Sequence, residues 1–229
     1  MNQHLKIVFE VEEKQLVTPD KKINRNTIDL IAMILTNFMN GEKQVILVSA
    51  GAIAAGVEKL QLSQYPKTLF EKQAVAAIGQ VELIRRYQNV FDQYNQMIGQ
   101  VLLDRSILKN HKRQTNAKNT FDKLLKQNVI PIINENDVTS TADIEAEDNY
   151  PLTAVVANLA KAHVLIQLND DFSFNVIEQA KSQIVVIKDR NKLFSYIDAF
   201  ENEMFKDDRH ILFPFSQEDY GYFKKVVLD

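Results

Sequence analysis

Short apolar runs alternate with longer segments of helical periodicity along most of the 229 residues of this chain. Apolar runs of strand length occupy residues 5–11, 45–48, 97–103, 129–133, 164–168 and 184–187. Between most of them, apolar residues recur three and four positions apart, which is typical of helices. Strands that alternate with helices form βαβ units, whose parallel strands build a sheet covered on both faces. The pattern therefore predicts an α/β protein with a mainly parallel sheet. We expect a single domain over residues 1–229, because no linker or repeat divides the chain.

Local signals refine three parts of this pattern. Residues 26–40 carry apolar side chains on one helical face, and Asn26 is the expected N-cap. Residues 67–94 predict two helical pieces hinged near Gly79. Residues 210–213 predict a last strand, with a short helix after it.

The composition excludes several classes of protein. A net charge of -3 and a pI near 5.9 argue against a nucleic-acid partner, because no basic stripe is available to neutralise phosphates. The absence of cysteine removes disulfides and thiolate chemistry, and the four histidines lack ligand spacing, so no metal site is predicted. The amino-terminal residues lack the apolar stretch of a signal peptide, and no apolar run is long enough to span a membrane. We therefore expect a cytoplasmic protein without a membrane partner.

The segment QVILVSAGAIAAG, from Gln44 to Gly56, contains the most informative turn. A glycine between a strand and a helix lets backbone approach a ligand closely, and the start of the helix offers free N–H groups to an anion. A tight turn with alanine and glycine also occurs simply for packing. Both interpretations, an anion-binding turn at Gly51 and plain packing, stay open on the residues alone.

A polar segment follows the apolar run at residues 129–133. It begins with Asn134 and continues through acidic and amide residues to Asp148 and Asn149. Such side chains at the carboxyl end of a strand can receive an ammonium group and orient a small polar molecule. The alternative is a solvated acidic loop with Asx turns. The abrupt change from VIPII to NEND favours a binding site.

Five motifs resemble those of the glutamate 5-kinases, which belong to the amino-acid-kinase family. They are VILVSAGAIAAG, KQAVAAIGQ (Lys72–Gln80), QVLLDR (Gln100–Arg105), TNAKNT (Thr115–Thr120) and VIPIINEND (Val129–Asp137), and they occur in the expected order. The resemblance covers roughly residues 5–170. It implies a three-layer αβα sandwich around a mainly parallel sheet. It also implies the reaction of ATP with L-glutamate to give L-glutamyl 5-phosphate, the first step of proline synthesis.

The resemblance also implies the substrate pocket. In the family, the acidic loop binds glutamate, and Asp137 and Asn149 fall on its substrate-binding positions. Asn134 and Asp148 fit the same pattern, and Gly51 occupies the family's glycine turn. The implied small-molecule partner is an amino acid such as glutamate or proline.

Several positions depart from the family pattern. The serine before the glycine turn is Ala50 here, which removes one hydroxyl donor to the substrate. The segment that ends GDND in the family ends EDNY, with Glu147 for the glycine and Tyr150 for the last aspartate. Glu10 stands where the family has a lysine, and carboxylates at 12 and 13 occupy its phosphate-binding loop. No catalytic residue is therefore assigned, because Glu10 and Ala50 replace the family's lysine and serine.

The nucleotide-binding motifs depart further. LNDDFSFN replaces the family's LTDxxGLY, which leaves Asn169 and Asp170 at nucleotide-contact positions without the glycine. The family's later glycine-rich segment has no recognisable counterpart, and no glycine occurs between Gly99 and Gly221. ATP and Mg²⁺ are the cofactors that the resemblance implies if the protein is active. The chain also ends before the position of the RNA-binding-like carboxyl domain (PUA) of many members, so none is expected here.

Three functions follow from these observations. The first is a glutamate 5-kinase-like protein with a partly kept amino-acid pocket, weak or absent catalysis and a regulatory role. The second is an active carboxylate kinase with a rearranged phosphate site that uses Lys14. The third is a structural subunit without a ligand. The resemblance implies a homo-oligomer or a hetero-oligomer with an intact glutamate 5-kinase.

Overall fold

The computed structural model describes residues 4–104, 106–107, 110–139, 152–178, 183–205 and 224–228. Its strands are β1 (Lys6–Val11), β2 (Gln44–Ser49), β3 (Ile98–Leu103), β4 (Ile130–Glu135), β5 (Val164–Leu168), β6 (Phe174–Glu178), β7 (Gln183–Ile187) and β8 (Lys224–Leu228). Its α-helices are α1 (Glu13–Leu16), α2 (Arg25–Asn40), α3 (Ala52–Lys59), α4 (Leu69–Phe91), α5 (His111–Lys126), α6 (Leu152–Ala160) and α7 (Arg190–Met204). The described residues also include the short 3₁₀ helices η1 (Asp92–Tyr94) and η3 (Asp137–Thr139).

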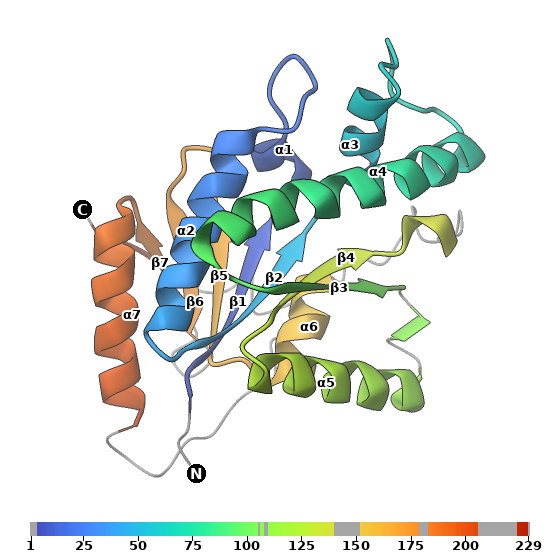
Figure 1. Ribbon diagram of the computed structural model, residues 1–229. Helices are drawn as coiled ribbons and strands as arrows, with labels where there is room; N and C mark the ends of the chain where they lie inside the picture. The colour runs from blue at the N-terminus through green and yellow to red at the C-terminus, as the bar shows by residue number, and fades with distance from the viewer. Residues whose placement is uncertain are drawn as a thin grey trace.

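The strands of the described residues form one sheet in the order β3-β4-β2-β1-β5-β6-β7-β8 (Figure 1). All neighbours from β3 to β5 pair in parallel, as do β7 and β8. Strand β6 is antiparallel to both of its neighbours. The prediction of a mainly parallel sheet is confirmed. Because ligands in such sheets bind beyond the carboxyl ends of the strands, this edge is where a site is expected.

Helices cover both faces of the sheet, which confirms the three-layer αβα sandwich (Figure 1). Alternate residues of a strand point to opposite faces. In β1, Phe9 therefore packs into the apolar cluster that includes α2, α4 and α7, whereas Val8 packs into the cluster formed with α5 and α6. No helix of the described part of the chain is long and apolar enough to cross a membrane.

Helix α2 begins one residue before the predicted start. Its N-cap is Asn24, whose side chain accepts a hydrogen bond from the amide of Asn26 at 3.0 Å. The prediction of Asn26 as the cap is therefore wrong. Both residues are asparagine, and only the backbone conformation of Asn24, with φ -77° and ψ 103°, decides between them.

Helix α4 is continuous from Leu69 to Phe91, so the predicted hinge near Gly79 is wrong. A Cβ atom on Gly79 would lie 1.7 Å from the carbonyl oxygen of Ala52 at the start of α3. The glycine is therefore required for the close approach of two helices. A sequence pattern cannot separate this role from flexibility, because both use the missing side chain.

Two of the strands near the carboxyl end were not predicted. Strand β6 begins within the segment LNDDFSFN, which the sequence related only to a nucleotide-binding motif. Strand β8 lies at residues 224–228. The strand predicted at residues 210–213 lies outside the described residues.

Candidate functional site

The turn between β2 and α3 lies at the carboxyl edge of the sheet. Gly51 has a φ of +102°, a conformation that favours glycine, and a Cβ atom there would lie 3.4 Å from Leu16 Cδ1. Ser49 is buried, and its hydroxyl is hydrogen-bonded to the Tyr87 hydroxyl at 2.9 Å. Burial also raises the pKa of Tyr87. Ser49 is thus part of the core, whereas Ala50 beside it has no side-chain donor.

The small residues of α3 have a packing role. A Cβ atom on Gly56 would lie 2.1 Å from the carbonyl oxygen of Val75 in α4, so the two helices touch through backbone. The packing interpretation therefore holds for Gly56. It does not exclude ligand binding at Gly51, because the first amides of a helix have no partner within the helix.

Strand β4 brings Asn134 to the same edge. Its Oδ1 accepts a hydrogen bond from the amide of Glu135 at 2.7 Å, and its side chain is 6% exposed. Its Nδ2 has no hydrogen-bond partner among the described residues. A buried amide group left without an acceptor is costly, so it marks a position where a ligand oxygen or a water is expected.

Asp137 follows in η3, against α4. Burial raises the pKa of its carboxyl to about 6, and the negative charges of Glu135 and Glu13 add to the rise. Gln80 of α4 supports this loop, because its Nε2 donates to the carbonyl oxygen of Glu135 at 3.1 Å and its side chain is hydrogen-bonded to Asp137. Gln100 in turn donates to Gln80 Oε1 at 3.2 Å.

Neither Gln80 nor Gln100 was assigned to the site from the sequence. The available signal was that each stands at the end or start of a family motif. Membership of a motif does not show which side chain faces the acidic loop. The packing of α4 on η3 shows it.

Glu10 points to the opposite face of the sheet from Phe9, toward α6. Gln167 of β5 donates from Nε2 to Glu10 Oε2 at 2.6 Å, and the hydroxyl of Thr153 donates to the other carboxylate oxygen. Burial raises the pKa of Glu10, although these two hydrogen bonds oppose the rise. The residue at the family's lysine position is thus held in place by two neutral donors.

The segment after β1 meets the turn after β5. The Lys14 ammonium lies 3.2 Å from Glu12 Oε2 and 3.6 Å from Asp170 Oδ1. Gln15 donates from Nε2 to Asp170 Oδ1 at 2.6 Å and accepts from the amide of Glu12 at 3.0 Å. Lys14 therefore bridges the carboxylates of Glu12 and Asp170, and the Gln15 side chain links Asp170 to the backbone of Glu12.

Asn169 is engaged within the turn that joins β5 and β6. Its Nδ2 donates to Ser173 Oγ at 2.9 Å and to Asn175 Oδ1 at 3.0 Å, and its Oδ1 accepts from Asn175 Nδ2 at 3.0 Å. Its side chain therefore shapes the turn. The assignment of Asn169 and Asp170 to nucleotide binding stays a prediction.

The structure brings Gly51, Asn134 and Asp137 to one edge of the sheet. Asp148 and Asn149, the other predicted substrate residues, lie outside the described residues, as do Glu147 and Tyr150. No group of three or more histidine, aspartate or glutamate side chains could hold a metal ion within the described part of the chain.

The profile of the amino acid kinase family matches residues 15–171. The chain belongs to the amino acid kinase family. It is 37% identical over 210 residues to a glutamate 5-kinase of Enterococcus faecalis, which covers 90% of this chain and 75% of that relative. A glutamate 5-kinase of Lactiplantibacillus plantarum is 42% identical over 187 residues (79% and 71%). One of Clostridium acetobutylicum is 44% identical over 165 residues (72% and 62%). The protein is therefore glutamate 5-kinase-like, as its motifs predicted.

Proposed function

We propose that this protein binds an amino acid of the glutamate type at the carboxyl edge of its sheet and phosphorylates it slowly or not at all. The similarity to glutamate 5-kinases supports the family reaction, in which ATP phosphorylates the side-chain carboxylate of L-glutamate. The protein then acts as a binding or regulatory member of the proline-biosynthesis lineage. Its partner in that role is a second copy or an intact glutamate 5-kinase.

The pocket side of this proposal rests on Asp137, Asn134 and Gly51. With a pKa of about 6, the carboxyl of Asp137 is mostly ionised at pH 7 and suits an ammonium group. The free Nδ2 of Asn134 suits a carboxylate oxygen. We propose that Asp148 and Asn149 complete this pocket, while Ala50 withholds one hydroxyl donor.

The observation that carries the weak-kinase proposal is Glu10. Phosphoryl transfer depends on positioning and on cations that offset the charge of the phosphates. Replacing a lysine by a glutamate changes the local charge by two units. Each unit changes the Coulomb energy with a phosphate charge about 4 Å away by about 4 kcal/mol at an effective dielectric constant of about 20. Glu12 and Glu13 add negative charge to the same loop. These residues do not fit a triphosphate. The lost electrostatic stabilisation corresponds to a decrease of several orders of magnitude in the rate of phosphoryl transfer.

Mg²⁺ would reduce this repulsion if Asp148 and Asp170 held it with the nucleotide. In the described residues, however, Asp170 already accepts a hydrogen bond from Gln15 and pairs with Lys14. We therefore propose Asn169 and Asp170 as nucleotide contacts only for the runner-up function. That runner-up is an active kinase in which Lys14, already between two carboxylates, turns toward the phosphates.

Turnover and ATP binding together test the proposal. With glutamate, ATP and Mg²⁺, and with the product trapped as the hydroxamate, we expect almost no turnover. Robust turnover that Lys14→Gln abolishes would replace the proposal by the runner-up.

Calorimetry with ATP and Mg²⁺ tests the role of Glu10 directly. We expect the wild type to bind poorly and Glu10→Gln to bind at least tenfold more tightly, because the neutral amide removes the repulsion and keeps the shape. Glu10→Lys would add the missing cation. Glu42→Gln makes the same charge change at an exposed site at the amino end of β2 and should bind as the wild type does. Equal binding by all variants would contradict the proposal.

A thermal-shift series separates a ligand-binding role from a structural subunit. Glutamate at 100 times its dissociation constant adds about 2.7 kcal/mol to stability, and proline serves as the second probe. No shift with any amino acid would favour the structural subunit.

A further inference from the structure

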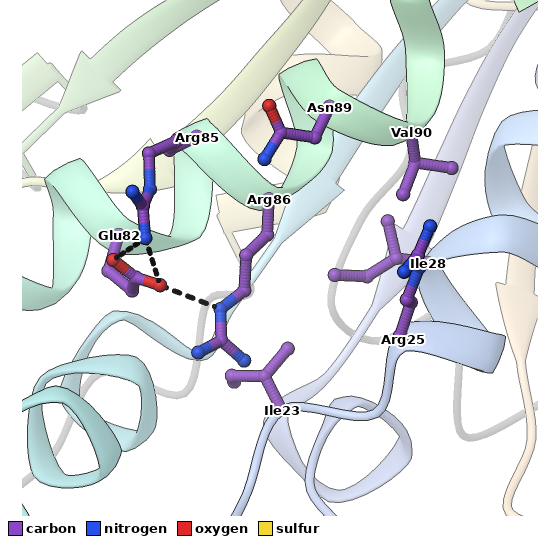
Figure 2. Close-up of a pocket in the computed structure, with 8 residues that line it drawn as sticks. All are labelled: Ile23, Arg25, Ile28, Glu82, Arg85, Arg86, Asn89 and Val90. Carbon is purple, nitrogen blue, oxygen red and sulfur yellow. Dashed lines mark hydrogen bonds and ion pairs between the residues drawn. The ribbon is translucent and has the colours of Figure 1, made fainter. Parts of the chain in front are cut away.

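A cavity lies beside the proposed amino-acid pocket, between the first turn of α2 and the carboxyl-terminal half of α4 (Figure 2). Its volume is about 310 Å³, at the small end of the range for small-molecule sites. Its apolar wall consists of the buried side chains of Ile23, Ile28 and Val90. Its polar wall contains three arginines.

The arginines differ in how far they are already engaged. Arg86 is bonded to both oxygens of Glu58, at 2.9 and 3.0 Å, and to Glu82. Arg85 donates from one terminal nitrogen to Glu82, and its side chain is 59% exposed. The Arg25 guanidinium makes no hydrogen bond or ion pair within the described part of the chain. Figure 2 shows Arg86 from α4 and Arg25 from α2 on opposite sides of the cavity.

Glu82, the acidic residue of the cavity wall, has no capacity left for a ligand cation. It accepts hydrogen bonds from Arg85 and Arg86 and pairs with Lys59 at 3.6 Å. Although burial opposes ionisation, the two arginines lower the pKa of Glu82. Three guanidinium groups face two carboxylates here, so the cavity carries a net positive charge beside an apolar wall.

From this arrangement we propose a binding site for a small monocarboxylate with a compact apolar body. The unpaired guanidinium of Arg25 holds the carboxylate, because guanidinium groups form strong charge-assisted hydrogen bonds to it, and Arg85 and Arg86 add positive charge along the cavity wall. The side-chain amide of Asn89 supplies a further donor at the rim. The apolar body lies against Ile28 and Val90, where it removes apolar surface from water.

The same charges disfavour a zwitterionic amino acid. Its ammonium group would lie among three guanidinium groups, and Glu82 could not compensate it. The ligand class therefore differs from the one that Asp137 suits. The two sites are close neighbours, because Ile23 Cδ1, in the apolar wall, lies 4.0 Å from the position of a Cβ atom on Gly51.

Titration calorimetry at low salt tests the site with three probes of the same size. The probes are 4-methylpentanoate, its neutral amide and leucine, which adds the ammonium group. We expect saturable binding of the carboxylate, and binding at least tenfold weaker for the amide and for leucine. No saturable binding of the carboxylate would overturn the proposal, as would equal affinity for all three probes.

Two exposed substitutions locate the binding. Arg25→Gln should weaken the affinity for 4-methylpentanoate about tenfold, and Asn89→Asp should weaken it at least as much by placing a negative charge at the rim. Lys126→Gln on α5 removes one exposed positive charge on the other face of the sheet and should leave the affinity unchanged. Asp137→Asn should also leave it unchanged, which separates this site from the proposed amino-acid pocket. Wild-type affinity in both Arg25→Gln and Asn89→Asp would overturn the proposal.

Discussion

At the scale of single residues, the raised pKa of Asp137 couples stability to pH. An aspartate has a pKa near 3.9 in an unfolded chain, and burial raises that of Asp137 to about 6 in the folded protein. Between these two values the folded state binds more protons, so the free energy of unfolding falls as the pH rises. Above about pH 6 the fall is complete.

Asp137→Asn should remove this fall, because the neutral amide does not ionise. Relative to the wild type, the variant should gain about 1–2 kcal/mol in free energy of unfolding between pH 4 and pH 7, after a discount for solvent screening. Urea unfolding at several pH values measures it. Asp29→Asn, at an exposed site on α2, should follow the wild-type curve. A constant difference between wild type and Asp137→Asn at all pH values would contradict the assignment.

For Glu10 and Asn169, the sequence shows which residue occupies a position but not which side chains surround it. The replacement of the family's lysine by Glu10 was visible in the sequence, because the order of strands and motifs identifies which residue occupies the lysine position. Its hydrogen bonds to Thr153 and Gln167 were not visible, because these residues are distant in the chain and meet only across the sheet. The internal bonds of Asn169 were hidden for a different reason, since β6 was not predicted.

At the scale of secondary-structure elements, substitution of Gly79 distinguishes a role in helix packing from a role in helix flexibility. Alanine is more favourable than glycine in a helix by about 1 kcal/mol. If Gly79 were a hinge, Gly79→Ala should therefore stabilise the protein. The crossing of α3 and α4 predicts the opposite, because the new Cβ atom would lie 1.7 Å from Ala52 O. We expect a loss of about 3 kcal/mol in the free energy of unfolding.

Urea unfolding of two variants measures this effect. Lys123→Gly, at an exposed position in the interior of α5, should cost only about 1 kcal/mol. A stabilised Gly79→Ala variant would show that the glycine is there for flexibility.

At the scale of the whole molecule, helix α4 leaves an apolar face uncovered. Phe70, Ile78 and Val81 are 80%, 41% and 68% exposed, and Ala74 and Ala77 lie between them on the same helical face. Antiparallel pairing of two such helices would set Val81 against Ala74 and Ile78 against Ala77. The face is therefore complementary to itself, as a two-fold interface requires. We propose that a second copy of the chain covers it.

Val81→Glu should shift the protein from dimer to monomer, because it places two carboxylates in the paired surface. Light scattering coupled to gel filtration measures the mass. Met97→Glu, which makes the same kind of change at a residue 59% exposed outside α4, should leave the mass unchanged. A wild type that is monomeric at high concentration would contradict the homodimer.

The sequence by itself determined the layered α/β architecture and the membership of the amino acid kinase family. Both depend on local patterns, namely apolar periodicity and short motifs in a fixed order. Only the tertiary structure decided the role of Gly79, the partners of Glu10, the support of Asp137 by Gln80 and the cavity beside Arg25. Each of these depends on contacts between distant segments, and the packing of the helices on the sheet, rather than any local pattern, brings those segments together.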